Sequence, residues 1–157
     1  VEVLISDMKG DKSALDIVIE AKPDVLNHNV ETVKELYDKV RPEASYERSL
    51  EVLRYVKEKA PEMYTKTGIM VGLGETDEQV LSLMDDVLAT GCDILTIGQY
   101  LRPSPAHVEM TEYVTPEKFA YYKKAGEDKG FSYIASSPLV RSSYRAEEAL
   151  RAKKAQV

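Results

Sequence analysis

Short apolar runs alternate with longer amphipathic stretches along this chain of 157 residues, and this alternation constrains the fold most strongly. Runs rich in Val, Ile and Leu that end at polar or glycine residues are typical of buried strands. We expect strands over residues 1–5, 24–29, 65–73, 93–97 and 131–135. Because a helical stretch follows each of the first four strands, the pattern predicts parallel strands joined by right-handed crossovers.

Capping residues mark the ends of the predicted helices. The expected helices cover 12–21, 32–40, 46–59, 77–89, 116–128 and 144–154. Asp11 stands at the start of the first, and Thr76 with Gln79 forms a capping-box pattern. Thr115 precedes a proline at the first helical position, and Gly130 stops that helix. A long loop is expected over 98–114.

This pattern belongs to the α/β class, and either a doubly wound sheet or part of a β/α barrel fits it. In both architectures, ligands bind beyond the C-terminal ends of the parallel strands. The residues there are rich in amides, carboxylates and glycines: Ser6, Asp7, Asn27, His28, Asn29, Glu31, 72–75, 98–100, Ser136 and Ser137. Their convergence on one edge of the sheet predicts a binding site.

The composition excludes several classes of protein. A net charge of −6 argues against general nucleic-acid binding, and no apolar run approaches the length of a membrane span. The lone Cys92 excludes an internal disulfide, suits a reducing compartment and is expected to be a small buried residue. His28 and His107 are the only histidines, and no spacing resembles a pair of metal ligands.

Each candidate side chain also has a purely structural explanation. Asn29 and Glu31 suit a small polar ligand with hydroxyls, an amine or a carboxylate, but either could cap a helix. His28 could be a satisfied core histidine. The glycines of 72–74 let a backbone approach a ligand, or simply form a tight turn. By local chemistry alone, the serines at 142–143 fit the cap of the last helix.

Five sequence segments, taken together, resemble lipoyl synthases of the radical S-adenosylmethionine superfamily. They cover 23–33, 65–76, 95–104, 113–117 and 138–144, in the order of that family and over nearly the whole chain. The resemblance implies the C-terminal half of a partial, TIM-like β/α barrel with parallel strands. It also implies that 1–157 form a single incomplete domain, with an auxiliary-cluster segment at about 136–157. The start at Val1, inside a strand, suggests a piece of a longer chain.

The resemblance implies cofactors and roles for individual residues. Lipoyl synthases insert two sulfur atoms into a protein-bound octanoyl chain. One 4Fe-4S cluster cleaves S-adenosylmethionine, and a second, auxiliary cluster is the sulfur source. Ser143 would ligate the auxiliary cluster, with Ser142 as the fallback and Arg141 steadying the local charge. The residues expected around S-adenosylmethionine are Asn29, Glu31, Gly72, Gly74, Glu75 and Gln99.

The single cysteine departs from the family's pattern, which needs a CxxxCxxC motif and three further cysteines. We therefore expect this portion alone to bind no cluster stably and to be inactive without the missing N-terminal half. The implied protein partner is an octanoylated lipoyl-carrier protein, either a lipoyl domain or the glycine cleavage H protein. No nucleic acid or membrane is expected as a partner. The implied location is the cytoplasm, or the mitochondrial matrix in a eukaryote.

Two alternatives remain open from the sequence. The first is a different β/α-barrel enzyme, aldolase-like or phosphate-binding, which would need a catalytic lysine. Lys66, inside the third predicted strand, is the placed candidate. The second is a non-catalytic fragment that only complements a separate N-terminal half.

Overall fold

Five parallel strands form one sheet in the computed structural model, which describes residues 1–143, 147, 148, 150 and 151. The strands are β1 (Glu2–Leu4), β2 (Val25–Asn27), β3 (Tyr64–Val71), β4 (Ile94–Gln99) and β5 (Tyr133–Ser136). They lie in chain order across the sheet, and every neighbouring pair is parallel. A doubly wound sheet reverses its order at a switch point, and this sheet does not. The strand order is therefore that of a partial β/α barrel.

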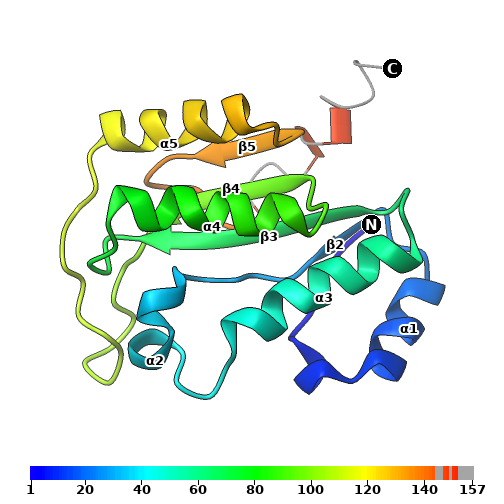
Figure 1. The fold of residues 1–157 in the computed structure, drawn as a ribbon. Coiled ribbons are helices and arrows are strands. Elements are labelled where there is room, and N and C mark those ends of the chain that lie inside the picture. The colour runs from blue at the N-terminus through cyan, green and yellow to red at the C-terminus, as the bar shows by residue number, and fades with distance from the viewer. Residues whose placement is uncertain (144–146, 149, 152–157) are drawn as a thin grey trace.

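The helices that connect the strands cover one side of the sheet. The long ones are α1 (Lys12–Glu20), α3 (Tyr46–Lys59), α4 (Asp77–Ala89) and α5 (Pro116–Lys129). Each crossover moves one strand in the same direction, so each helix packs on the same face. Figure 1 shows these helices following one another along that side. Among the described residues, no helix is long and apolar enough to span a membrane.

The main core lies between this helical layer and the sheet. Val71 and Ile97 of the strands are fully buried, and they belong to one cluster with Met84 of α4 and Phe119 of α5. The capping predictions are confirmed at the helix ends. The Asp11 carboxylate accepts hydrogen bonds from the first turn of α1, and Thr76 with Gln79 completes the capping box of α4.

The helix expected over 32–40 is wrong in extent. The chain forms a 3₁₀ turn, η2 (Lys34–Leu36), and then only a single helical turn, α2 (Tyr37–Val40). The residues before it run beside β3 instead. Glu31 N–H donates to the carbonyl of Gly68, and the Glu31 carbonyl accepts from Met70 N–H. Because this isolated bridge to β3 uses both backbone hydrogen-bonding groups of Glu31, the helical segment begins only at residue 34.

The closing part of the chain is described only in part. Of the helix expected over 144–154, residues 147, 148, 150 and 151 are helical, and the other positions lie outside the described residues.

A further short 3₁₀ element, η1 (Met8–Gly10), links β1 to α1.

Candidate functional site

The C-terminal ends of the central strands enclose a cavity of about 100 Å³. Its lining comes from three strand ends and from the closing segment: Asn29, Glu31, Gly68, Ile69, Met70, Thr96, Gly98, Val140, Arg141 and Ser142. Asn29, Glu31 and Arg141 were all expected at a site, although Arg141 lies about 110 residues from the other two in the sequence. The edge of the sheet predicted to bind a ligand therefore carries a cavity.

Two glycines make room for this cavity. A side chain at Gly68 would place its Cβ 2.7 Å from the Thr96 hydroxyl and 3.0 Å from Asn29 Oδ1. A Cβ at Gly98 would overlap the carbonyl oxygen of Val140. Both positions are therefore closed to larger residues as long as the neighbouring segments stay where they are.

The closing segment, residues 137–142, crosses the end of β4 directly above Gly98. Ser137 N–H donates to the carbonyl of Ile97, and Gln99 N–H donates to the carbonyl of Pro138. Within the segment Val140 is buried, whereas Ser143, which follows the segment, is exposed. The segment thus brings Arg141 and Ser142 into the cavity lining, while Ser143, the serine favoured from the sequence, lies just outside it.

Asn29 has a polar atom that the fold leaves without a partner, and Glu31 beside it has a carboxyl with a perturbed pKa. Asn29 Oδ1 is buried and accepts no hydrogen bond within the described part of the chain. An unmet buried acceptor costs about 1–3 kcal/mol, so it marks a place for a donor from a ligand or from water. Burial raises the pKa of the Glu31 carboxyl, against the opposing effects of the Arg41 charge and a hydrogen bond with Asn29.

Arg41 is a site residue that the sequence analysis missed. Its guanidinium donates weakly to the Asn29 carbonyl and the Tyr37 hydroxyl, both at 3.4 Å from Nη1. It also lines a second hollow, of about 300 Å³, together with Leu4, Ile5, Ser6, His28, Asn29 and Glu31. Asn29 and Glu31 thus stand between two hollows, with a cation beside them. The sequence offers no periodicity or motif at Arg41 that marks it.

His28 is a structural histidine. The carbonyl of Ile5 can only accept, so Nδ1 at 3.0 Å must donate to it. Nε2 is then the acceptor for the Ser49 hydroxyl at 2.9 Å. Burial lowers the pKa of His28, which keeps the ring neutral. Both ring nitrogens are therefore used inside the core.

The turn after β3 and the end of β4 form a support beside the cavity. The Glu75 carboxylate accepts from the N–H groups of Gly72 and Leu73, at 2.7 and 2.9 Å. The Gln99 amide donates to the carbonyl of Glu112 and accepts from Val114 N–H, which holds the loop of residues 100–114. The predicted S-adenosylmethionine contacts that do not line the cavity are Gly72, Gly74, Glu75 and Gln99.

Lys66 does not offer a free amine. Its side chain is only 2% exposed, and Nζ lies 2.9 and 3.2 Å from the two carboxylate oxygens of Glu2. Glu2 also accepts from the amide of Asn27. A Schiff-base lysine needs an accessible amine near the ligand. This geometry therefore counts against the aldolase-like alternative.

Cys92 is buried, as expected, and burial raises the pKa of its thiol to about 12. Its sulfur lies 3.4 Å from the carbonyl of Thr65. A thiol held in this way is a poor source of thiolate. Within the described residues, no group of three or more His, Cys, Asp and Glu side chains could hold a metal ion.

Comparison with known proteins gives a consistent result. A sequence model described as the radical SAM superfamily matches residues 1–87. A lipoyl synthase from Caldanaerobacter subterraneus subsp. tengcongensis is 57% identical over 150 residues, which are 96% of this chain and 53% of that protein. Lipoyl synthases from Rubrobacter xylanophilus and Bacteroides thetaiotaomicron are 58% and 52% identical, over 94% and 96% of this chain and 46% and 53% of theirs. The chain spans about half the length of these curated relatives.

Gly98→Ala should displace the closing segment. The new methyl group would overlap the Val140 carbonyl, so we expect the free energy of unfolding to fall by about 1–3 kcal/mol, as for overpacked sites. The amide of Val140, which donates to Ser137, should exchange its hydrogen faster. Urea denaturation and hydrogen exchange measure the two effects. Leu139→Ala, at a 78% exposed position of the same segment, is the control and should change neither. An unchanged Gly98→Ala variant would contradict the close contact.

Glu31→Gln should stabilise the chain at neutral pH but not in acid. Because burial raises the pKa of Glu31 in the folded chain, the folded state holds its proton to higher pH than the unfolded state does. The free energy of unfolding therefore falls as the pH rises through this raised pKa. The glutamine variant has no carboxyl to titrate at this position. Its free energy of unfolding should therefore exceed that of the parent at about pH 8, and the difference should vanish below about pH 4. Urea denaturation at the two pH values, with exposed Glu58→Gln as the control, tests this. An equal advantage at both values would refute it.

Proposed function

Because the chain belongs to the radical SAM superfamily and matches lipoyl synthases along nearly its whole length, we propose that it forms one wall of an S-adenosylmethionine site. The enzyme would insert two sulfur atoms into a protein-bound octanoyl chain. The observation that carries the proposal is the unmet acceptor of Asn29, which stands beside Glu31 and Arg41 at the strand ends.

The donors and acceptors around the cavity match the parts of S-adenosylmethionine. The ligand carries two ribose hydroxyls, which can donate to Asn29 Oδ1 and to the Glu31 carboxylate. It also carries an amino-acid carboxylate, which suits the guanidinium of Arg41. Gly68 and Gly98 let Asn29 and the closing segment pack closely on the strands that carry the site. When bound, this ligand supplies the radical chemistry of the superfamily. The part of the described side chains is to bind and orient it.

The described residues do not fit an iron–sulfur cluster. Such clusters are normally held by several cysteine thiolates, and the only thiol here, that of Cys92, is buried and protonated. We propose that the thiolates come from sequence outside these 157 residues. The isolated chain should then bind no cluster and be inactive.

Ser143 and Arg141 have a proposed role at the auxiliary cluster. Ser143 is exposed next to the cavity, where its hydroxyl is accessible to a group held by another part of the protein. An oxygen ligand is harder than the usual thiolate and therefore holds soft cluster iron less firmly. Arg141 lines the cavity and would offset the negative charge there.

The supporting residues would act through the backbone. We assign Glu75 and Gln99 to holding the turn at Gly72 and Gly74 and the loop after β4, because their polar atoms already bind backbone groups. The proposed protein partner is an octanoylated carrier, either a lipoyl domain or a glycine cleavage H protein.

Asn29→Ala should weaken the binding of S-adenosylmethionine to the full-length protein. Losing one hydrogen bond to a ligand hydroxyl costs about 0.5–1.5 kcal/mol, which is a two- to tenfold rise in the dissociation constant. Isothermal titration measures it. Leu139→Ala, exposed on the neighbouring segment, serves as the matched truncation and should bind normally. An unchanged affinity in Asn29→Ala would remove the main support for the proposed site.

Ser143→Cys tests the proposed oxygen ligand. In the full-length protein, this variant should keep its auxiliary cluster, because thiolate is the better ligand for iron, but should form no lipoyl product. Iron content and visible absorbance report the cluster, and mass spectrometry of the carrier reports the product. The same measurements on Ser142→Cys distinguish which of the two neighbouring serines is the proposed ligand. If Ser143→Cys turns over normally, the proposed role of the oxygen ligand is wrong.

A further inference from the structure

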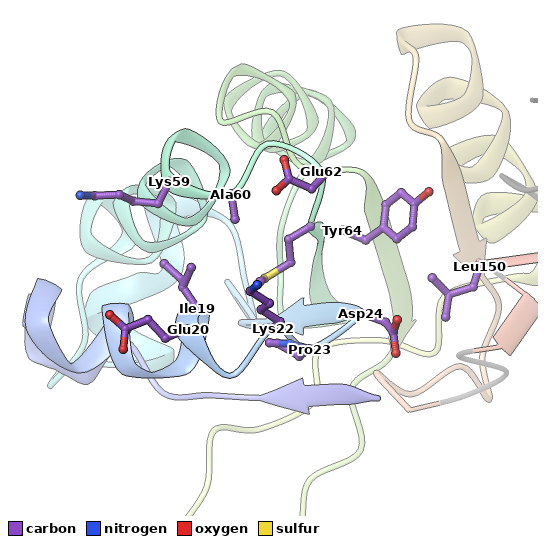
Figure 2. Close-up of a pocket in the computed structure, with 11 residues that line it drawn as sticks. Ile19, Glu20, Lys22, Pro23, Asp24, Lys59, Ala60, Glu62, Tyr64 and Leu150 are labelled. Carbon is purple, nitrogen blue, oxygen red and sulfur yellow. The ribbon is translucent and has the colours of Figure 1, made fainter.

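A hollow of about 530 Å³ lies at the opposite end of the strands from the strand-end cavity. Three carboxylates and two ammoniums surround its apolar floor, as Figure 2 shows for Glu20, Asp24, Glu62, Lys22 and Lys59. Because charges of both signs are nearly balanced there, this hollow favours neither an anion nor a cation. The strand-end site differs, because it combines an unmet acceptor with a cation beside it.

Tyr37 holds the segment that carries the ligand-facing side chains of this strand-end site. The tyrosine is 5% exposed, and its hydroxyl donates to the carbonyl of Val30, the residue between Asn29 and Glu31. From the opposite side, Thr67 of β3 accepts the N–H of Val30 on Oγ1 at 3.0 Å. Residues 29–31 are therefore fixed on the helix side by Tyr37 and on the sheet side by β3.

The segment depends on this restraint because its conformation is unfavourable. Glu31 has φ at +75°, in the left-handed region that residues with a side chain rarely adopt. Strained backbone of this kind persists only where the surrounding contacts enforce it. If the bond from Tyr37 is lost, residues 29–31 can relax to other conformations, which would turn Asn29 and Glu31 away from the cavity.

Tyr37 also contacts the cation of the site. Arg41 Nη1 lies 3.4 Å from the Tyr37 hydroxyl, and the guanidinium lies 5.8 Å from the centre of the Tyr37 ring. The face of a tyrosine ring attracts a cation at this distance. The two residues stand one helical turn apart, and Arg41 N–H donates to the carbonyl of Tyr37 at 2.7 Å. One side chain thus supports both the segment of residues 29–31 and the proposed partner of the ligand carboxylate.

We propose that Tyr37 is a positioning residue, which together with Thr67 keeps residues 29–31 in the conformation that binds S-adenosylmethionine. Tyr37 lines neither the cavity nor the hollow beside Arg41, so it acts through its neighbours and does not touch the ligand. This role rests on the proposed S-adenosylmethionine site, whose groups Tyr37 orients. Because the site is then formed before the ligand arrives, binding does not have to order it.

Tyr37→Phe in the full-length protein tests this role. The variant keeps the ring but loses the bond to Val30, so only part of the free protein should have the binding conformation. We expect the dissociation constant of S-adenosylmethionine, measured by isothermal titration, to rise about three- to tenfold, as for a competent fraction of about 0.3 to 0.1.

Tyr46→Phe is the matched control. Tyr46 is also 5% exposed, and its hydroxyl donates to Asp86 of α4 at 2.8 Å, within the helical layer. The control loses one hydroxyl bond of a buried tyrosine, as Tyr37→Phe does, so urea denaturation should show a similar loss of stability in both variants. Only Tyr37→Phe should bind S-adenosylmethionine more weakly.

A double-mutant cycle separates positioning from a general loss of stability. Asn29→Ala removes one of the groups that Tyr37 orients, so Tyr37→Phe should weaken binding less in that background than in the parent. A purely structural effect would be the same in both backgrounds.

Several results would overturn this role for Tyr37. They are an unchanged affinity in Tyr37→Phe, an equal loss of affinity in Tyr46→Phe, and full additivity with Asn29→Ala. If Tyr37→Phe does not fold by circular dichroism, Thr67→Val releases Val30 from the other side, with the same expected rise and the same overturning results. Normal binding by Asn29→Ala would overturn the proposed site as well, whereas weak binding by Asn29→Ala beside normal binding by Tyr37→Phe overturns only the positioning role.

Discussion

The parallel pairing of β3 with β4 is the constraint on which the strand-end site depends. It is the longest pairing in the sheet, and it places Gly68 beside Thr96 and Met70 beside Gly98. All four residues line the cavity. A slip of one residue would turn every side chain to the other face of the sheet and put Ile97 in the place of Gly98. The floor of the cavity would then be lost, and so would the contact surface at Gly98 on which the closing segment packs.

Two unfavourable features of the chain lie together at this edge. Glu31 has a left-handed backbone, with φ at +75°, which costs a residue with a side chain about 1–3 kcal/mol. Next to it lies the unmet acceptor of Asn29. Among the described residues, the side-chain oxygens of Asn27, Thr32 and Thr65 are also buried without a hydrogen bond, whereas Lys57 and Asp93 at the other end of β4 are paired. The strained residue and the unmet acceptor of Asn29 both line the cavity, where a bound ligand could supply the missing donor.

Local patterns predicted the elements whose boundaries depend on local chemistry. The capping box at Thr76 and the amphipathic spacing of α3 were sufficient to define those helices. The helix expected over 32–40 failed because a long-range interaction prevailed: residues before it pair with β3, and Tyr37 donates its hydroxyl proton to the carbonyl of Val30. No periodicity within that segment reports these partners.

The sequence by itself determined the α/β class, the parallel order of elements and the edge at which polar groups gather, because these follow from short-range spacing and from the handedness of crossovers. The five segments that resemble lipoyl synthases were also sufficient to indicate the family, which the comparisons support. Only the tertiary structure decided between a doubly wound sheet and a partial barrel. The tertiary structure also shows that the polar side-chain atoms of His28 and Gln99 bind groups within the fold. Asn29 and Glu31, by contrast, face hollows beside Arg41. The physical reason is that satisfaction of a polar group depends on partners many residues away, and a sequence shows residue types without their contacts.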